Sequence, residues 1–166
     1  MNMKTIKAVP VTQENWASYG YLANIADPKG AYGMGDYPCT FHRDMVLAPM
    51  ASSAPIAFGS LKLGKREMVI KDVEYHSAAS EVMMPFDDDM VMYVGPANSG
   101  EPEPDNLEAF IIPKGTMTIF RAGMWHGAPF PLHGAGTVLI CLPERSYLTD
   151  TKKIILQEQD WIKIEL

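Results

Sequence analysis

The sequence predicts an all-β fold, a barrel or sandwich of the jelly-roll type, from three observations. Thirteen glycines and thirteen prolines are spread along the 166 residues and divide the chain into many short segments. Most of these segments have the length of about four to eight residues that is typical of strands. Only one short stretch places apolar residues at helical spacing. Many short strands with little helix favour a β-barrel or sandwich, which we expect to form one domain over residues 1–166.

The one predicted helix lies near the N-terminus, at residues 13–25. Trp16, Tyr19 and Ala23 recur there at spacings of three and four, and Thr12 is a candidate N-cap. Residues 26–30 and 33–38 follow as turn or loop material.

Strands are predicted along the rest of the chain. The polar stretch at residues 95–105 is expected to be a surface loop between two of them. The predicted strands cover residues 40–47, 56–63, 67–76, 80–84, 90–94, 109–112, 116–120, 137–142, 153–156 and 161–164.

The composition excludes several classes of protein. A formal net charge of −6 and a pI of about 5.1 argue against nucleic-acid binding and against adsorption to an anionic membrane. No apolar stretch approaches the ~20 residues that a membrane-spanning helix needs, and no apolar signal region follows the basic residues near the N-terminus. Cys39 and Cys141 could form one bridge, but we expect them to be reduced, buried thiols in a cytoplasmic protein.

The strand predicted at residues 67–76 carries polar side chains at one end. Alternation places Met68, Ile70, Asp72, Glu74 and His76 on one face, which begins apolar and ends polar. Such a face could feed a site at the open end of a barrel. An edge strand with an exposed tip is the alternative, and periodicity alone does not choose between them.

Two distant segments together predict a metal site. Glu74 and His76 point the same way, a turn brings Glu81 back on the adjacent antiparallel strand, and a glycine-containing turn presents His126. Two carboxylates and two imidazoles suit manganese, iron, nickel or zinc better than calcium or magnesium. The alternative is that the histidines are ordinary hydrogen-bonded side chains and that the glutamates cap or solvate strand ends.

These two segments resemble the two cupin motifs. In the first motif, His76 and Glu81 match the family pattern, while Glu74 stands where the first histidine is usual. In the second, Gly115, Gly123 and His126 match in register, with Arg121 in place of the usual proline. The resemblance implies a cupin-type double-stranded β-helix, a jelly-roll barrel, with a short N-terminal helix.

Over residues 9–149 the chain also resembles the ureidoglycolate lyase family, a group with the cupin fold. The most specific matches are Val73-Glu74-Tyr75-His76, Met84-Pro85-Phe86, Leu107-Glu108-Ala109-Phe110 and Trp125-His126. The chain departs from the family at Glu81, where glutamine is usual, at Gly127, where a second histidine is usual, and at Tyr75, where arginine is usual. The resemblance implies an enzyme of purine (allantoin) degradation that forms a homodimer.

If the substrate is ureidoglycolate, collapse of its hemiaminal carbon gives glyoxylate and urea. A metal held by Glu74, His76, Glu81 and His126 would lower the pKa of the substrate hydroxyl. Arg121 or Lys62 could hold the substrate carboxylate, and Trp125 could form a wall of the pocket or fill the core. The base is not identified by the sequence, with His42 and Asp44 as candidates.

Other functions fit the same residues. A metal-dependent cupin of another kind, such as a sugar or sugar-acid isomerase, would use the metal to hold a hydroxy-carbonyl unit. A non-catalytic cupin would bind a small molecule without converting it. For all three functions we expect a small molecule as the binding partner, and we expect no binding to nucleic acid or to a membrane.

Overall fold

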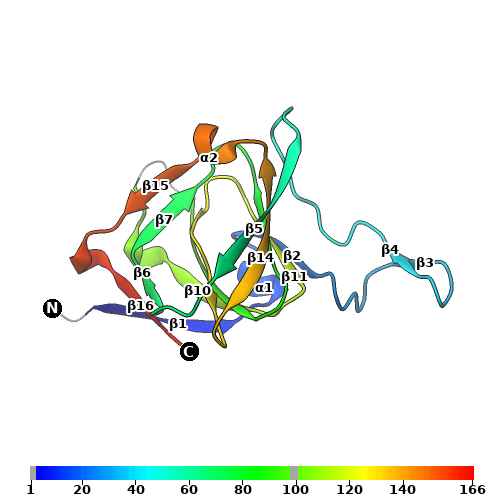
Figure 1. Cartoon of the computed structure of the whole chain (residues 1–166), viewed down its shortest axis with the longest axis horizontal. Helices are drawn as coiled ribbons and strands as arrows, with labels where there is room; N and C mark the ends of the chain where they lie inside the picture. The colour runs from blue at the N-terminus through cyan, green and yellow to red at the C-terminus, as the bar shows by residue number, and fades with distance from the viewer. Residues whose placement is uncertain (1–2, 98–100) are drawn as a thin grey trace.

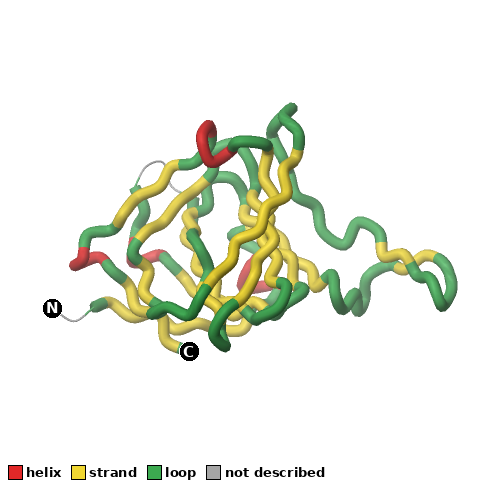
Figure 2. The backbone as a smooth tube through the Cα atoms, viewed as in Figure 1, coloured by secondary structure: helices red, strands yellow, loops and turns green. Residues whose placement is uncertain are grey.

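The computed structural model describes residues 3–97 and 101–166. Strands dominate it and the helices are short (Figure 2). The elements are β1 (Lys4–Pro10), α1 (Gln13–Trp16), β2 (Gly20–Asn24), β3 (Gly33–Met34), β4 (Phe41–His42), β5 (Ile56–Leu63), β6 (Val69–Ile70), β7 (Asp72–Tyr75), β8 (Glu81–Pro85), β9 (Met90–Gly95), the 3-10 turn η1 (Pro104–Asn106), β10 (Glu108–Ile112), β11 (Thr116–Phe120), β12 (Trp125–His126), β13 (Phe130–Pro131), β14 (Gly136–Pro143), α2 (Ser146–Thr149), β15 (Lys152–Ile155), the 3-10 turn η2 (Glu158–Asp160) and β16 (Ile162–Glu165).

Two sheets face each other in the barrel (Figure 1). Within the described residues, the larger sheet has the order β15-β7-β12-β9-β10-β1-β16-β6, with β13 also paired to β9. The smaller sheet has the order β2-β11-β8-β14-β5. Apart from the consecutive strands β9 and β10, neighbouring strands in these orders are distant in the chain, as in a jelly roll. The predicted all-β jelly-roll barrel is confirmed.

The barrel interior is filled from both sheets. Met92 and Phe110 of the larger sheet pack with Met83, Phe120 and Val138 of the smaller sheet in one buried cluster. Because alternate residues of a strand point to opposite faces, their neighbours are available for a second core.

The second core lies on the other face of the larger sheet. Val91 and Tyr93 of β9 and Val73 of β7 pack there against Ile162 and Ile164 of β16. The larger sheet is therefore buried on both faces, and its inward-facing side chains are held rigidly.

The predicted helix at residues 13–25 is too long. α1 covers only Gln13–Trp16, capped by Thr12, whose hydroxyl accepts from the Asn15 amide while the Asn15 side chain accepts from Thr12. The chain then enters β2, which pairs with β11. Trp16 and Tyr19 are three residues apart and both rings pack on Phe110. This shared contact accounts for the helix-like spacing, although the helix ends at Trp16.

The predicted strand at residues 67–76 is broken at Lys71. β6 pairs with β16, whereas β7 pairs with β12 and β15. Ile70 and Val73 consequently lie in the same core, although strict alternation places them on opposite faces. The alternation holds only from β7 onward, which is the part that leads to His76.

The predicted strand at residues 40–47 is mostly loop. Only Phe41–His42 is extended, paired with Gly33–Met34 in a small hairpin that projects from the barrel (Figure 1). Residues near 46–50 instead cover the outer face of the smaller sheet, where Val46 and Met50 pack near Val82 and Ile119. Apolar side chains in this segment thus mark a sheet-covering loop.

Strand β1 was not predicted from the sequence. It runs parallel to both β10 and β16, and such pairing leaves no hairpin signal in the sequence. In the part of the chain that the structure describes, no helix has both the length and the apolar character required to traverse a membrane.

Candidate metal centre

Three buried side chains converge inside the barrel: His76, Glu81 and His126. His76 follows β7, Glu81 begins β8 and His126 ends β12, so both sheets contribute. The Nε2 atoms of His76 and His126 lie 3.1 Å and 2.6 Å from the same atom, Oε2 of Glu81. The potential ligand atoms of the three residues all lie within 4.8 Å of one another.

Main-chain carbonyls determine how both imidazoles are oriented. Nδ1 of His126 lies 2.8 Å from the carbonyl oxygen of Met124, and Nδ1 of His76 lies 2.9 Å from that of Asp150. A carbonyl oxygen can only accept, so each Nδ1 carries a proton. In a neutral imidazole the other nitrogen, Nε2, then presents a lone pair, and both lone pairs point at the Glu81 carboxylate.

Three electron-pair donors facing one point require a cation between them. Protons can supply that charge, and so can a metal ion. Burial favours the uncharged form of Glu81, yet the charges and hydrogen bonds of His126 and His76 outweigh it and lower the pKa of Glu81 to about 2. Burial also opposes the charged form of His76, but its hydrogen bond and attraction to Glu81 raise the pKa of His76 above its ordinary value.

The donor set fits a transition-metal ion. Two imidazole nitrogens and one carboxylate oxygen are ligands that zinc, iron, manganese and nickel accept, and the second nitrogen of each ring already has a carbonyl partner. Exposed sites of this composition are common without metal, but all three of these side chains are at most 5% exposed. The residues therefore fit a divalent cation.

Two aromatic rings, Phe120 and Trp16, pack in series against the His126 ring. The Phe120 ring stacks on the His126 ring at a centroid distance of 4.7 Å, and Trp16 packs edge-on against Phe120 at 5.1 Å. The short helix α1 is thus connected to the candidate metal centre through the rings of Trp16 and Phe120. Phe120 lies directly opposite Glu81 in the β8–β11 pair, which places both on the inner face.

Comparison with known proteins decides the family. The family model described as ureidoglycolate lyase matches residues 3–163. The chain belongs to the ureidoglycolate lyase family. A provisionally named ureidoglycolate lyase of Agrobacterium fabrum is 25% identical over 137 residues, which cover 81% of this chain and 80% of that protein.

Solved structures with a similar backbone carry much lower identity. The manganese-containing oxalate decarboxylase of Bacillus subtilis is 13% identical, with a TM-score of 0.45 over 83% of this chain and 28% of that chain. A dTDP-6-deoxy-D-glucose-3,5-epimerase of Legionella pneumophila is 12% identical, with a TM-score of 0.44 over 81% of this chain and 80% of that chain.

Glu74, the fourth predicted ligand, is not among the converging side chains. It lies directly opposite His126 in the β7–β12 pair, so both side chains emerge on the same face of the sheet. Glu74 is half-buried, and its negative charge helps to raise the pKa of His76. This member of the ureidoglycolate lyase family therefore has a carboxylate beside the metal centre and outside the three-residue group.

The structure does not bring the predicted substrate-binding cations to the metal centre. Nη1 of Arg121 donates to the carbonyl of Ser18 at 3.1 Å, and its guanidinium lies 5.0 Å from the Tyr21 ring. Lys62 is exposed on β5, where alternation turns it away from the inward-facing Leu61 and Leu63.

The candidate base His42 and the candidate pocket residue Trp125 also lie elsewhere. His42 belongs to β4 of the projecting hairpin (Figure 1). Trp125 precedes His126 in β12 and therefore points to the opposite face, where it packs edge-on with Tyr75 at 4.5 Å. Trp125 fills the second core, which is one of the two roles predicted for it from the sequence.

Two of the three departures from the family pattern, Gly127 and Tyr75, are explained by their packing. A Cβ at Gly127 would lie 1.9 Å from the hydroxyl oxygen of Tyr93, so this chain has no room for the usual second histidine. Tyr75, where arginine is usual, packs against Trp125. These two departures lie on the face opposite the candidate metal centre, whereas the third, Glu81, is one of its three side chains.

Sequence reasoning missed the residues that hold the histidines. Met124 and Asp150 act through main-chain carbonyls, which no side-chain pattern reveals. Thr151, whose hydroxyl lies 3.1 Å from Nδ1 of His76, is far from either motif. Phe120 belonged to a predicted strand, but its stacking on His126 had no sequence signal.

Proposed function

We propose that this protein is a metal-dependent carbon–nitrogen lyase that cleaves ureidoglycolate, or a closely related small hydroxy or ureido acid. Its products from ureidoglycolate are glyoxylate and urea. The observation that carries the proposal is the convergence of His76, Glu81 and His126, with both Nε2 atoms on one carboxylate oxygen, in a chain of the ureidoglycolate lyase family.

His76, Glu81 and His126 would hold the metal ion, with manganese, iron, nickel and zinc as candidates. When bound, the metal supplies a positive charge that lowers the pKa of a chelated hydroxyl and stabilises the developing carbonyl. The hydrogen bonds at each Nδ1 fix the two rings, and burial excludes bulk water from the ligand atoms. This rigidity preserves the positions of the donors during turnover.

Glu74 is the residue we assign to proton transfer. It shares the inner face with His126 and carries a carboxylate that no ligand position uses. As a base it would take the proton of the C2 hydroxyl while the C2–N bond breaks and the carbonyl forms. The same proton then passes to the departing urea nitrogen, so the reaction consumes and releases no net proton.

Turnover with a defined metal tests the proposal. The protein is stripped with a chelator, reconstituted with one metal at a time, and assayed for glyoxylate and urea from ureidoglycolate. We expect both products in equal amounts from the reconstituted protein and none from the stripped protein. Metal-independent release, or no release with any of the four metals, contradicts the proposal.

The two alternatives give different results in the same assay. A sugar or sugar-acid isomerase binds metal, is silent on ureidoglycolate and converts a keto sugar. A binding cupin retains a small acid without converting either compound.

The expected homodimer, small carboxylate substrate and cytoplasmic location remain predictions. Ile56 and Phe58 are exposed on the edge strand β5, and we expect sedimentation to report a dimer.

A further inference from the structure

The turn between His76 and Glu81 sets the distance between two of the three metal-binding side chains. It comprises residues 77–80 and connects β7 to β8, which belong to different sheets. The sequence predicted that β7 and β8 pair as adjacent antiparallel strands, but no strand pairing joins them in the described residues. A strand ladder therefore does not determine their spacing. Ala79 and Ser80 have main-chain contacts with residues 49–50, whereas Ser77 and Ala78 need another source of order.

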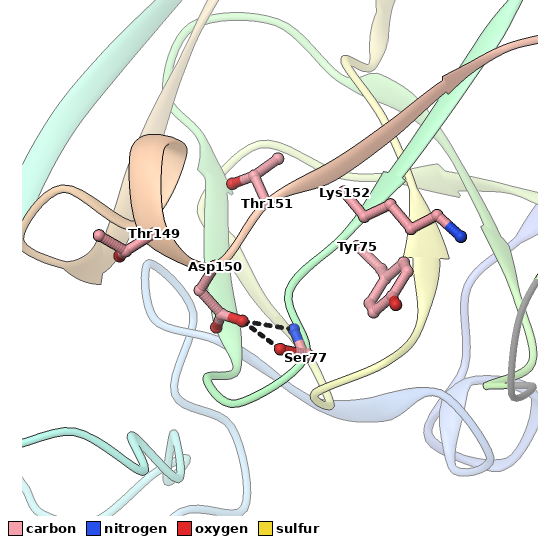
Figure 3. Close-up of a pocket in the computed structure, with 6 residues that line it drawn as sticks. All are labelled: Tyr75, Ser77, Thr149, Asp150, Thr151 and Lys152. Atoms are coloured by element: carbon pink, nitrogen blue, oxygen red, sulfur yellow. Dashed lines mark hydrogen bonds between the residues drawn. The ribbon is translucent and has the colours of Figure 1, made fainter.

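Asp150 supplies that order from the C-terminal part of the chain. Its carboxylate accepts hydrogen bonds from the amides of Ser77 at 2.8 Å, Ala78 at 3.1 Å and Ala79 at 3.1 Å. The Ser77 hydroxyl donates to the same carboxylate. Figure 3 shows the Asp150 side chain pointing at Ser77. Both residues line a cavity of about 170 Å³. One side chain thus holds three consecutive amides of the turn.

The same segment also fixes the ring of His76. Nδ1 of His76 lies 2.9 Å from the Asp150 carbonyl oxygen and 3.1 Å from the Thr151 hydroxyl. That hydroxyl donates its own proton to the carbonyl of Ser146 at 2.9 Å, so toward His76 it can only accept. Both partners therefore require a proton on Nδ1 and leave Nε2 free for a cation.

Asp150 and Thr151, together called the clamp, are anchored to the barrel by hydrogen bonds that do not involve the turn. The Asp150 amide donates to the Ser146 carbonyl at 2.9 Å, and the Ser146 hydroxyl donates to the carbonyl of Pro143, the last residue of β14. β14 pairs with β8, which begins at Glu81. The positions of His76 and Glu81 are thus both tied to the β8–β14 strand pair: Glu81 belongs to β8, and the clamp connects His76 to the end of β14.

We propose that Asp150 and Thr151 are positioning residues of the metal centre: the Asp150 carboxylate sets the turn between His76 and Glu81, and the two residues together fix the tautomer of His76. The proposal rests on the proposed metal-dependent function. Partners of this kind contribute about 10–100-fold to metal affinity.

Metal affinity of the full-length protein tests the proposal. Co²⁺ is titrated into chelator-stripped wild type, Asp150→Ala and Thr151→Val, and binding is followed by the visible absorption of the ion. We expect the dissociation constant to rise about tenfold or more in Asp150→Ala and by a smaller factor in Thr151→Val. Thr151→Val keeps the carboxylate clamp and serves as the second test if Asp150→Ala does not fold.

Asp87→Ala is the matched control. The Asp87 carboxylate likewise accepts from a main-chain amide, that of Thr137 in β14 at 2.6 Å, but Asp87 lies past the far end of β8 from Glu81. It should lose stability without any change in Co²⁺ affinity. Hydrogen exchange of the amides at residues 77–79 in metal-free protein gives a second readout, which should accelerate in Asp150→Ala alone.

Unchanged Co²⁺ affinity in both variants, beside normal binding by wild type, overturns the positioning role and leaves the proposed function intact. An equal loss in Asp87→Ala also overturns it, because general destabilisation then explains the effect. Failure of wild type to bind Co²⁺ refutes the metal centre itself, and this inference with it.

Discussion

The backbone amide of Gly123 donates a 2.7 Å hydrogen bond to the carbonyl oxygen of His76. This bond ties the turn that presents His126 to the strand end that presents His76. The two segments that carry the histidines of the candidate metal centre are therefore joined by main chain as well as by the shared carboxylate of Glu81. Gly123 adopts φ +84°, a conformation that L side chains rarely occupy.

Gly123→Ala should weaken the metal centre. A methyl group at φ +84° costs about 1–2 kcal/mol, and its Cβ would lie 3.3 Å from that of Ala97. We expect the free energy of unfolding to fall by about that amount and Co²⁺ affinity to fall as well. The control is Gly30→Ala, at φ +77° with no neighbour within 4 Å, which should lose stability alone. Equal metal affinity in both variants contradicts this role for Gly123.

Gly127→Ala should destabilise the protein through Tyr93. Its Cβ would lie 1.9 Å from the Tyr93 hydroxyl oxygen, and overpacking of this kind costs about 1–3 kcal/mol. In the double variant with Tyr93→Phe the nearest ring carbon lies at 2.8 Å, so denaturant unfolding should show partial recovery. Gly59→Ala, with no neighbour within 4 Å, should be nearly neutral. A harmless Gly127→Ala refutes the steric account of this family departure.

The stability of the metal-free protein should depend on pH through Glu81 and His76. The pKa of Glu81 is lowered to about 2 in the folded state, so its stabilising contribution is complete above its ordinary pKa and declines as pH falls toward 2. The pKa of His76 is raised, so its contribution is complete below the ordinary histidine pKa and is lost as pH rises through the folded value.

Urea unfolding in chelator across the pH range measures this dependence. A bound divalent ion replaces the protons between the donors, so metal should remove the loss on the alkaline side. Glu81→Gln abolishes the carboxylate charge and should flatten both limbs. A metal-free profile that is identical in wild type and Glu81→Gln would argue against the electrostatic coupling.

The variant Glu74→Gln distinguishes two possible roles of Glu74, as a metal ligand or as the residue that transfers the proton. Because Glu74 lies outside the converging group, we expect full metal content and a turnover number about 10²–10⁴-fold lower. Elemental analysis and the glyoxylate assay on the same preparation give both values. Loss of the metal would instead make Glu74 a ligand, as the sequence predicted.

Much of the barrel could be predicted from the sequence because its strands are separated by turn residues. The strands at residues 56–63 and 116–120 have the predicted boundaries. β12, with only Trp125–His126, is too short for any pattern, and the break at Lys71 depends on which strands β6 and β7 pair with.

The converging residues were likewise within reach of sequence reasoning, and their supports were not. His76, Glu81 and His126 belong to two local motifs whose spacing is visible in the sequence. The carbonyls of Met124 and Asp150 are common to every residue type, so only folding reveals their contact with the imidazoles. Arg121 was predicted as a substrate group on its chemistry, whereas its position beside Ser18 and Tyr21 follows from the tertiary structure.

Metal content of the purified protein, with and without His126, tests the central claim most directly. Elemental analysis is made on wild type, His126→Ala and, as a control, His133→Ala, whose exposed ring pairs with the buried carboxylate of Asp88. We predict about one divalent ion per chain in wild type and in His133→Ala, and almost none in His126→Ala. Full retention of metal by His126→Ala, or its absence from wild type after reconstitution, would contradict the account.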